Sequence, residues 1–255
     1  MTSENRADPQ SEIGVVGEDE AAIADRVRAA GASAAVVEPA GAAEVDTTIA
    51  VGKEALISLV REGVTGPVLP VGVDGSVPGV QESRLDGAIE SLLNEDVGTT
   101  DQPLLRASVG TDHYVALMDI MTVTEEPAKI SEFTIEPRVR DRARTVDRVR
   151  ADGVVVATAA GTPGYATAAG GPVIDPASSA VSVVPVGPFR IEQTHWTLEL
   201  PVTLTVAREG AAVSLLVDDA EVAPVPTDEP VELTWGEPLT LVLTEQSRSS
   251  FAGEQ

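Results

Sequence analysis

The hydrophobic pattern of this chain changes its period near residue 99, and this change limits the folds open to it. Before that point, short apolar runs typical of buried strands alternate with segments whose apolar residues recur every three or four positions, as in helices. After it, apolar residues form a long series of strand-like runs separated by turn-forming residues. The sequence therefore predicts an α/β domain followed by a mostly antiparallel β domain.

The α/β domain is expected over residues 13–98, after a polar, acidic N-terminus at 1–12 that does not resemble a signal peptide. Strands are predicted at 13–16, 34–37, 48–51 and 67–73. Helices are predicted at 18–30 and 54–61, and a third should begin at Ser83 as its N-cap. Alternation of strand and helix with short connections is typical of a small parallel sheet.

The β domain is expected over residues 99–243, and residues 244–255 read as a flexible tail. Its strands are predicted at 104–109, 114–124, 130–136, 153–157, 181–185, 196–206, 212–217, 231–235 and 239–243. A stretch rich in Gly and Ala at 161–171 interrupts them and is predicted to be a loop that opens a short helix.

The charge balance restricts the partners of this protein. Forty-one acidic residues face seventeen basic ones, which gives a net charge of −24 that would repel nucleic acid and anionic membranes at ordinary salt. The acids could form a surface for cations or basic partners, or they could be a solvated surface adapted to molar salt. Their even spread, the presence of only two lysines and the 3% aromatic content favour salt adaptation of the haloarchaeal kind.

Several kinds of chemistry are excluded by residue content. The absence of cysteine removes disulfides, thiolate catalysis and cysteine metal ligands. His113 and His195 each lack a second ligand at metal-binding spacing, so no metal site is predicted. No apolar run approaches the ~20 residues that cross a bilayer, and we expect a cytoplasmic protein.

The most informative stretch runs from Asp152 to Pro172. A buried strand is expected to end at Thr158, after which a glycine-bearing turn feeds a helix whose free N–H groups could hold an anion or ribose hydroxyls. The adjacent glycines 170 and 171 then end that helix. Taken alone, the pattern fits equally well a tight strand-to-helix connection that binds nothing.

The order of residues in this stretch resembles the signature of the NAD kinase family, in which D-G-x-x-x-x-T-x-x-G-S-T-A-Y precedes G-G-P. Weaker similarity extends over about residues 13–243, including Leu216 to Val222, which is similar to a family segment containing D-G-Q. The resemblance implies a Rossmann-like first domain, a β-rich second domain, an NAD site in the cleft between them, and a homodimer or homotetramer. It implies nine dinucleotide-binding positions: Gly52, Lys53, Asp119, Asp152, Thr158, Gly161, Thr162, Gly164 and Tyr165. In the family, the residues at the positions of Asp152 and Tyr165 contact the dinucleotide, sometimes across a subunit boundary.

The pattern departs from the family at the catalytic turn. Family members carry Gly-Gly-Asp-Gly-Thr after the third strand, and the Asp acts beside the ribose 2′-hydroxyl as a base or a metal organiser. Here the turn reads Val-Gly-Lys-Glu-Ala, so Lys53 stands in place of that Asp and Glu54 in place of a glycine. An ammonium group can neither accept the hydroxyl proton nor bind Mg²⁺. Met118 also replaces the Asn before Asp119, and Pro163-Gly164 replaces Thr-Ala before the tyrosine.

Three hypotheses therefore stay open. The chain could bind NAD or NADP with weak or no phosphoryl transfer; it could be an active NAD kinase that uses Mg²⁺, ATP and another carboxylate, Asp74 or Asp119; or it could be a scaffold subunit of an active paralogue. Six arginines between Arg138 and Arg150 could feed phosphates to the site or could pair with neighbouring acids, and strand periodicity favours pairing.

Overall fold

A computed structural model of the chain describes residues 12–73, 77–126, 129–139, 142–189, 195–208 and 210–248. The chain forms two compact units, one of residues 1–102 and 239–255 and the other of residues 103–238. The sequence places the boundary at 98/99, and the structure divides the chain between Gln102 and Pro103. The second unit, however, ends at Pro238, because the chain then returns to the sheet of the first unit.

The first unit is built on one six-stranded sheet whose order is β2-β1-β3-β4-β19-β5. Its strands are β1 (Glu12–Gly17), β2 (Ser33–Val36), β3 (Thr47–Val51), β4 (Val68–Val71), β5 (Gly98–Gln102) and β19 (Leu239–Leu243). The first four are mutually parallel, as predicted, and β19 joins parallel to β4 while β5 runs antiparallel to β19. The predicted strand 239–243 therefore exists but belongs to the α/β unit.

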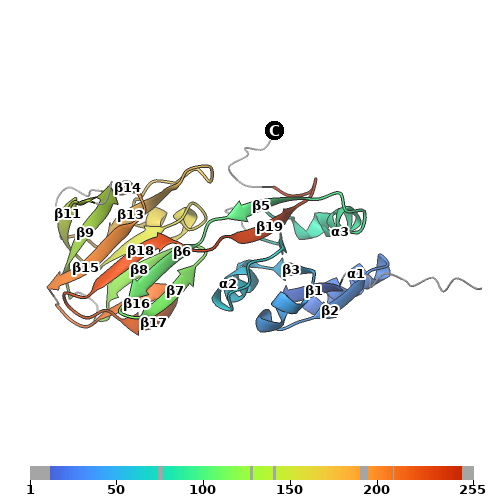
Figure 1. Cartoon of the computed structure of the whole chain (residues 1–255), viewed down its shortest axis with the longest axis horizontal. Coiled ribbons are helices and arrows are strands. Elements are labelled where there is room, and N and C mark those ends of the chain that lie inside the picture. Colours follow the sequence, from blue (N-terminus) through green and yellow to red (C-terminus); the bar gives the residue numbers. More distant parts are fainter. Residues whose placement is uncertain are drawn as a thin grey trace, which may run out of the picture. The chain divides into compact units, whose positions relative to one another are not determined.

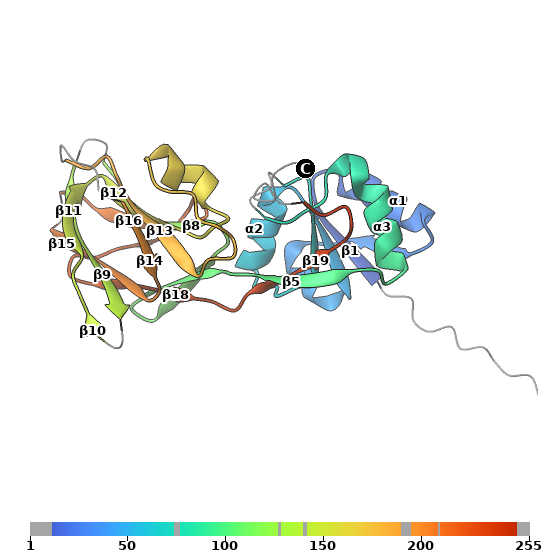
Figure 2. The same cartoon turned by 90° about the horizontal axis from the view of Figure 1, so that it is seen from above.

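Within the described part of this unit, three α-helices cover the sheet: α1 (Glu20–Ala29), α2 (Lys53–Arg61) and α3 (Leu85–Leu93). Apolar residues of α1 and α3 share one buried cluster with the strands, whereas those of α2 lie outside it, and Figure 2 shows α2 on the opposite side of the sheet. Two 3-10 segments, η1 (Pro39–Glu44) and η2 (Glu82–Arg84), complete the unit. Ser83 lies inside η2 and does not cap α3, whose N-cap is Arg84.

The second unit is a sandwich of two antiparallel sheets (Figure 1). One sheet has the order β10-β9-β15-β18-β6-β7, with β11 also paired to β9, and the other has the order β14-β13-β12-β8-β16-β17. The strands are β6 (Leu105–Val109), β7 (Asp112–Ala116), β8 (Asp119–Thr124), β9 (Ser131–Val139), β10 (Arg142–Ala143), β11 (Asp147–Ala151), β12 (Gly153–Ala157), β13 (Ala180–Val186), β14 (Trp196–Glu199), β15 (Val202–Arg208), β16 (Val213–Val217), β17 (Ala220–Pro224) and β18 (Pro230–Trp235).

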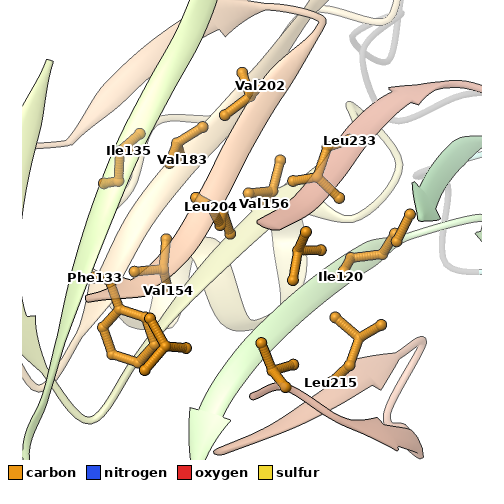
Figure 3. Packing of buried hydrophobic residues seen from close by; sticks show 14 of the residues in the cluster. Ile120, Phe133, Ile135, Val154, Val156, Val183, Val202, Leu204, Leu215 and Leu233 are labelled. Atoms are coloured by element: carbon orange, nitrogen blue, oxygen red, sulfur yellow. The ribbon is translucent and has the colours of Figure 1, made fainter. Parts of the chain in front are cut away.

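Alternate residues of both sheets fill the space between them. Phe133 and Ile135 of one sheet and Ile120, Val154 and Val156 of the other are all fully buried in this layer (Figure 3). Val155 and Ala157 of β12 face the opposite side, where Ala166 covers them. Because β12 is covered on both faces, its sequence is an unbroken apolar run, as is usual for such strands.

Two segments predicted as single strands are each divided. Residues 114–124 form β7 and β8, and residues 196–206 form β14 and β15. In both cases the two halves lie in different sheets, so the chain bends at 117–118 and at 200–201 to cross the sandwich. Apolar residues continue through both bends because Leu117 and Met118 are buried and the half-buried Leu200 packs against the core, and periodicity alone does not reveal such corners.

Candidate functional site

The substituted turn of the first unit lies between β3 and α2, as predicted. Gly52 has a φ of 87° and forms the N-cap of α2, and its N–H donates to the carbonyl of Val71 on the neighbouring strand at 2.8 Å. This positive φ is a conformation in which glycine costs little and other residues are strained. Lys53 is the first residue of α2 and is half-buried, while Glu54 beside it is exposed.

The charges at this helix start oppose one another. The N-terminus of α2 carries the positive end of the helix dipole, to which the ammonium of Lys53 adds a full positive charge. The carboxylate of Glu54 in the same turn reduces that local positive potential. Lys53 thus creates a cationic position where the family resemblance implies an acid.

In the second unit, the candidate site centres on residues 117–119, where the chain passes from β7 into β8. Leu117 is fully buried, and Met118 and Asp119 are 8% and 6% exposed. Thr158, at the end of β12, donates its hydroxyl towards the carbonyls of Leu117 and Met118 at 2.8 and 3.0 Å. Its backbone N–H donates to Met118 O at 2.9 Å. The motif threonine therefore binds the segment that carries Asp119.

The loop after Thr158 packs against the same segment. A Cβ on Gly161 would lie 2.0 Å from the carbonyl oxygen of Met118, so no larger residue fits without displacement of the backbone. Thr162 is fully buried, and its hydroxyl donates to the Ala159 carbonyl at 2.9 Å. The close contact with the Met118 backbone thus explains why position 161 of the motif is glycine.

The expected helix after this loop is only a short π-helical turn, η3 (Thr162–Ala166), with a non-helical Gly164 inside it. The N–H groups of Gly161 and Thr162 both donate to the Thr158 carbonyl, and that of Gly164 donates to the Gly161 carbonyl. These three N–H groups bind the loop itself. The expected anion cradle of free N–H groups at a helix start is therefore not formed at these positions.

The outer part of the loop is accessible. A Cβ on Gly164 would come within 3.9 Å of Asp119 Oδ2, and Tyr165 is 48% exposed. Asp119, Thr158, Gly161, Thr162 and Gly164 therefore come together around one corner of the sandwich, with Tyr165 next to them in the chain.

Asp152 does not join this group. It precedes β12, whereas Thr158 follows it, and the five residues of this extended strand place their Cα atoms about 20 Å apart. Asp152 is held in place by two backbone bonds, one to Val186 O and one from Thr124 N, and it lies against Gly187. Arg150 stacks over the exposed ring of Phe189 at the same end, with 5.7 Å between guanidinium carbon and ring centroid.

One buried acid was not singled out by the sequence. Asp218 is 7% exposed, occupies the turn between β16 and β17, and accepts three backbone N–H bonds from residues 117–119. Burial raises the pKa of its carboxyl above the ordinary value of 3.8; the three N–H bonds oppose this shift and neighbouring Asp219 adds to it. Its only sequence signal is its place in the segment that is similar to the D-G-Q segment of the family.

The remaining features considered in the sequence are metal ligands, membrane spans and the arginine cluster. Among the described residues, no group of three or more histidine, aspartate or glutamate side chains could hold a metal ion, and no helix is long and apolar enough to cross a membrane. Arg148 lies 3.5 Å from Glu132 on the adjacent strand, which agrees with pairing between neighbouring charges. Asp74 and Arg140 lie outside the described residues.

Comparison with known proteins adds sequence relatives and structural neighbours. Residues 118–238 match the family described as the ATP-NAD kinase C-terminal domain. The NAD kinase of Methanopyrus kandleri is 30% identical over 191 residues, which are 72% of this chain and 64% of that protein. The NAD kinase of Methanosarcina mazei is 31% identical over 179 residues, 67% of this chain and 61% of that protein. The aligned region thus spans less than two thirds of either relative.

Solved structures share the fold. An NAD kinase from Archaeoglobus fulgidus in complex with ATP has a TM-score of 0.77 and 19% identity, and covers 92% of this chain and 94% of its own. Yeast NADH kinase complexed with NADH has a TM-score of 0.78 and 12% identity, and covers 94% of this chain and 85% of its own. Residues 118–238 of this chain are thus similar to the C-terminal domain of ATP-NAD kinases, and the chain shares its fold with two solved NAD or NADH kinases.

Proposed function

We propose that this protein binds a pyridine dinucleotide, prefers NADP(H) to NAD(H), and transfers phosphoryl groups weakly or not at all. The observation that carries this proposal is Lys53 at the first position of α2, where the family resemblance implies the catalytic aspartate. Two related structures, one with ATP and one with NADH, support nucleotide binding by this fold.

The second unit supplies the binding groups. The Asp119 carboxylate beside Gly164 is an acceptor for a ribose hydroxyl, and the exposed ring of Tyr165 offers a face for stacking. Met118 brings no hydrogen-bonding side chain to the adenosine end, which lowers the expected affinity.

The preference for NADP(H) follows from charge. An ammonium at the start of α2 attracts a 2′-phosphate, and a partly exposed pair of this kind is worth about 1 kcal/mol, or roughly fivefold in affinity. Glu54 opposes the effect, and molar salt screens it.

Weak phosphoryl transfer also follows from Lys53. Loss of general-base assistance costs about 10²- to 10⁴-fold in rate. Mg²⁺ and ATP would be required for any remaining activity, and Asp119 is the described carboxylate that would support it in the alternative of an active NAD kinase. In the third alternative, the chain is a scaffold subunit of an active paralogue.

We also propose a homo-oligomer, either a dimer or a tetramer. Asp152 lies about 20 Å along the strand from Thr158, so one copy does not gather all the implied dinucleotide contacts around the Thr158–Gly164 corner. An Asp152 supplied by a second copy would complete the set, in line with the family's contacts across subunits.

Calorimetry at molar salt with NAD⁺ and NADP⁺ tests the binding proposal. We expect wild type to bind NADP⁺ more tightly by a few-fold, and Lys53→Asp to remove the preference. Lys129→Asp is the matched control, because it makes the same charge change at the only other lysine of the chain, which is exposed.

A kinase assay on the same proteins separates the alternatives. Turnover by wild type within tenfold of an ordinary NAD kinase would establish the active-kinase alternative. Absence of both dinucleotide binding and turnover would leave the scaffold alternative. Lys53→Asp should at most restore part of the transfer activity, because Glu54, Met118 and Pro163 also differ from the family.

A further inference from the structure

The strands next to residues 117–119 do not supply an acceptor for every backbone N–H group of this segment. β7 pairs with β6 in one sheet and β8 pairs with β12 and β16 in the other, so the chain between them leaves one ladder before it enters the next. Buried N–H groups without an acceptor cost about 1–3 kcal/mol each. An acceptor from elsewhere in the molecule is therefore required at this corner.

Asp218 supplies that acceptor. Its Oδ2 accepts the Leu117 N–H at 2.8 Å, and its Oδ1 accepts those of Met118 and Asp119 at 2.7 and 3.2 Å. The backbone of Asp218 adds a fourth bond, because its N–H donates to the Asp119 carbonyl at 3.0 Å. A single side chain thus satisfies three consecutive donors of the crossing segment.

The opposite side of the same segment is fixed by the motif loop. Thr158 holds the carbonyls of Leu117 and Met118, and Gly161 lies in backbone contact with Met118. The segment is therefore held from two sides. The β16–β17 turn binds its N–H groups and the Asp119 carbonyl, and the end of β12 binds the carbonyls of Leu117 and Met118.

We propose that Asp218 is a positioning residue of the candidate site, and that it sets the place of Asp119 beside Gly164 by holding the backbone of residues 117–119. The expected effect on affinity rests on the proposed dinucleotide binding. The positioning of the backbone does not, because the hydrogen bonds themselves lie within the second unit.

The test uses two neighbouring residues of one turn. Asp218 and Asp219 have φ values of 46° and 71°, a left-handed conformation that asparagine also tolerates. Asp218→Asn keeps the size of the side chain but turns an amide NH₂ towards backbone donors. Asp219→Asn removes the same charge from an exposed side chain and is the matched control.

Affinity for NADP⁺ is measured by calorimetry in a double-mutant cycle with Asp119→Asn. We expect Asp218→Asn to weaken binding about tenfold, the worth of one hydrogen bond to a charged acceptor, and Asp219→Asn to leave it within about twofold. In the Asp119→Asn background, Asp218→Asn should cost less than about twofold, because its effect acts through Asp119. Equal loss in the control, or full additivity with Asp119→Asn, would overturn the proposal.

Amide hydrogen exchange of residues 117–119 separates this inference from the proposed function. Faster exchange in Asp218→Asn than in Asp219→Asn, with no dinucleotide bound by wild type, would support the positioning role and reject dinucleotide binding. Unchanged exchange in Asp218→Asn would refute the positioning role whatever the protein binds.

Discussion

At the scale of single residues, three positions of this chain are set by different physical requirements. Gly52 is needed for a positive φ at the start of α2, Gly161 for contact with the backbone of Met118, and Asp218 as an acceptor for N–H groups of the crossing segment. Lys53 begins α2 where the family resemblance implies an acid, and the proposed change of function centres on it.

Gly161→Ala tests the close contact. Because its Cβ would lie 2.0 Å from a backbone oxygen, the loop or the crossing segment has to shift, and we expect a loss of about 1–3 kcal/mol in the free energy of unfolding. Urea unfolding followed by tryptophan fluorescence measures this loss. Gly236→Ala is the control in the same unit, because the nearest atom to its Cβ would lie 3.6 Å away and it should change stability by less than about 0.5 kcal/mol.

The raised pKa of Asp218 predicts a dependence on pH. Its contribution to the free energy of unfolding is fully present below the unfolded pKa and is lost as pH rises through the higher folded pKa. Asp218→Asn cannot ionise, so the free energy of unfolding of wild type minus that of the variant should fall as the pH rises above the ordinary pKa of 3.8. A difference that grows with pH would mean that the three N–H bonds outweigh burial.

At the scale of elements, the second unit depends on the apolar layer between its two sheets. Phe133 of β9 is fully buried there, and β9 pairs with both β11 and β15. Since this layer joins the strands that carry Thr158 and Asp119, its stability limits how well the candidate site is held.

We expect Phe133→Ala to lower the free energy of unfolding of the second unit by about 3–5 kcal/mol, because it leaves a cavity in this layer. The two tryptophans of the chain, Trp196 and Trp235, both lie in this unit and report its unfolding separately. Phe189→Ala serves as the control: its ring is 69% exposed, and loss of its contact with Arg150 should cost less than about 1 kcal/mol. Equal losses in the two variants would contradict this account of the core.

At the scale of the whole molecule, the net charge of −24 governs behaviour in solution. Repulsion between like charges acts over about 10 Å at 0.1 M salt but over only about 3 Å at 1 M. We expect the melting temperature to rise with sodium chloride, most steeply below about 1 M, where screening changes most. Calorimetric melting between 0.1 and 3 M measures this effect, and a melting temperature indifferent to salt would reject salt adaptation.

The sequence by itself determined the order of the two folds, most strand positions, and the glycines of the two site turns. These features depend on local periodicity and on backbone conformation, both of which neighbouring residues encode. Gly52 at the end of β3 and Gly161 after β12 lie where the sequence predicts turns. The departure at Lys53 from the family's turn was also visible in the sequence, because a motif specifies which residue types stand at a fixed spacing.

Only the tertiary structure decided which strands pair and which side chains meet. It divided residues 114–124 and 196–206 between two sheets, returned β19 to the first unit, and separated Asp152 from the other site residues by the length of β12. It also brought Asp218 to Leu117, 101 residues earlier in the chain. The physical reason is that an unpaired N–H group requires an acceptor but does not specify where in the sequence that acceptor lies.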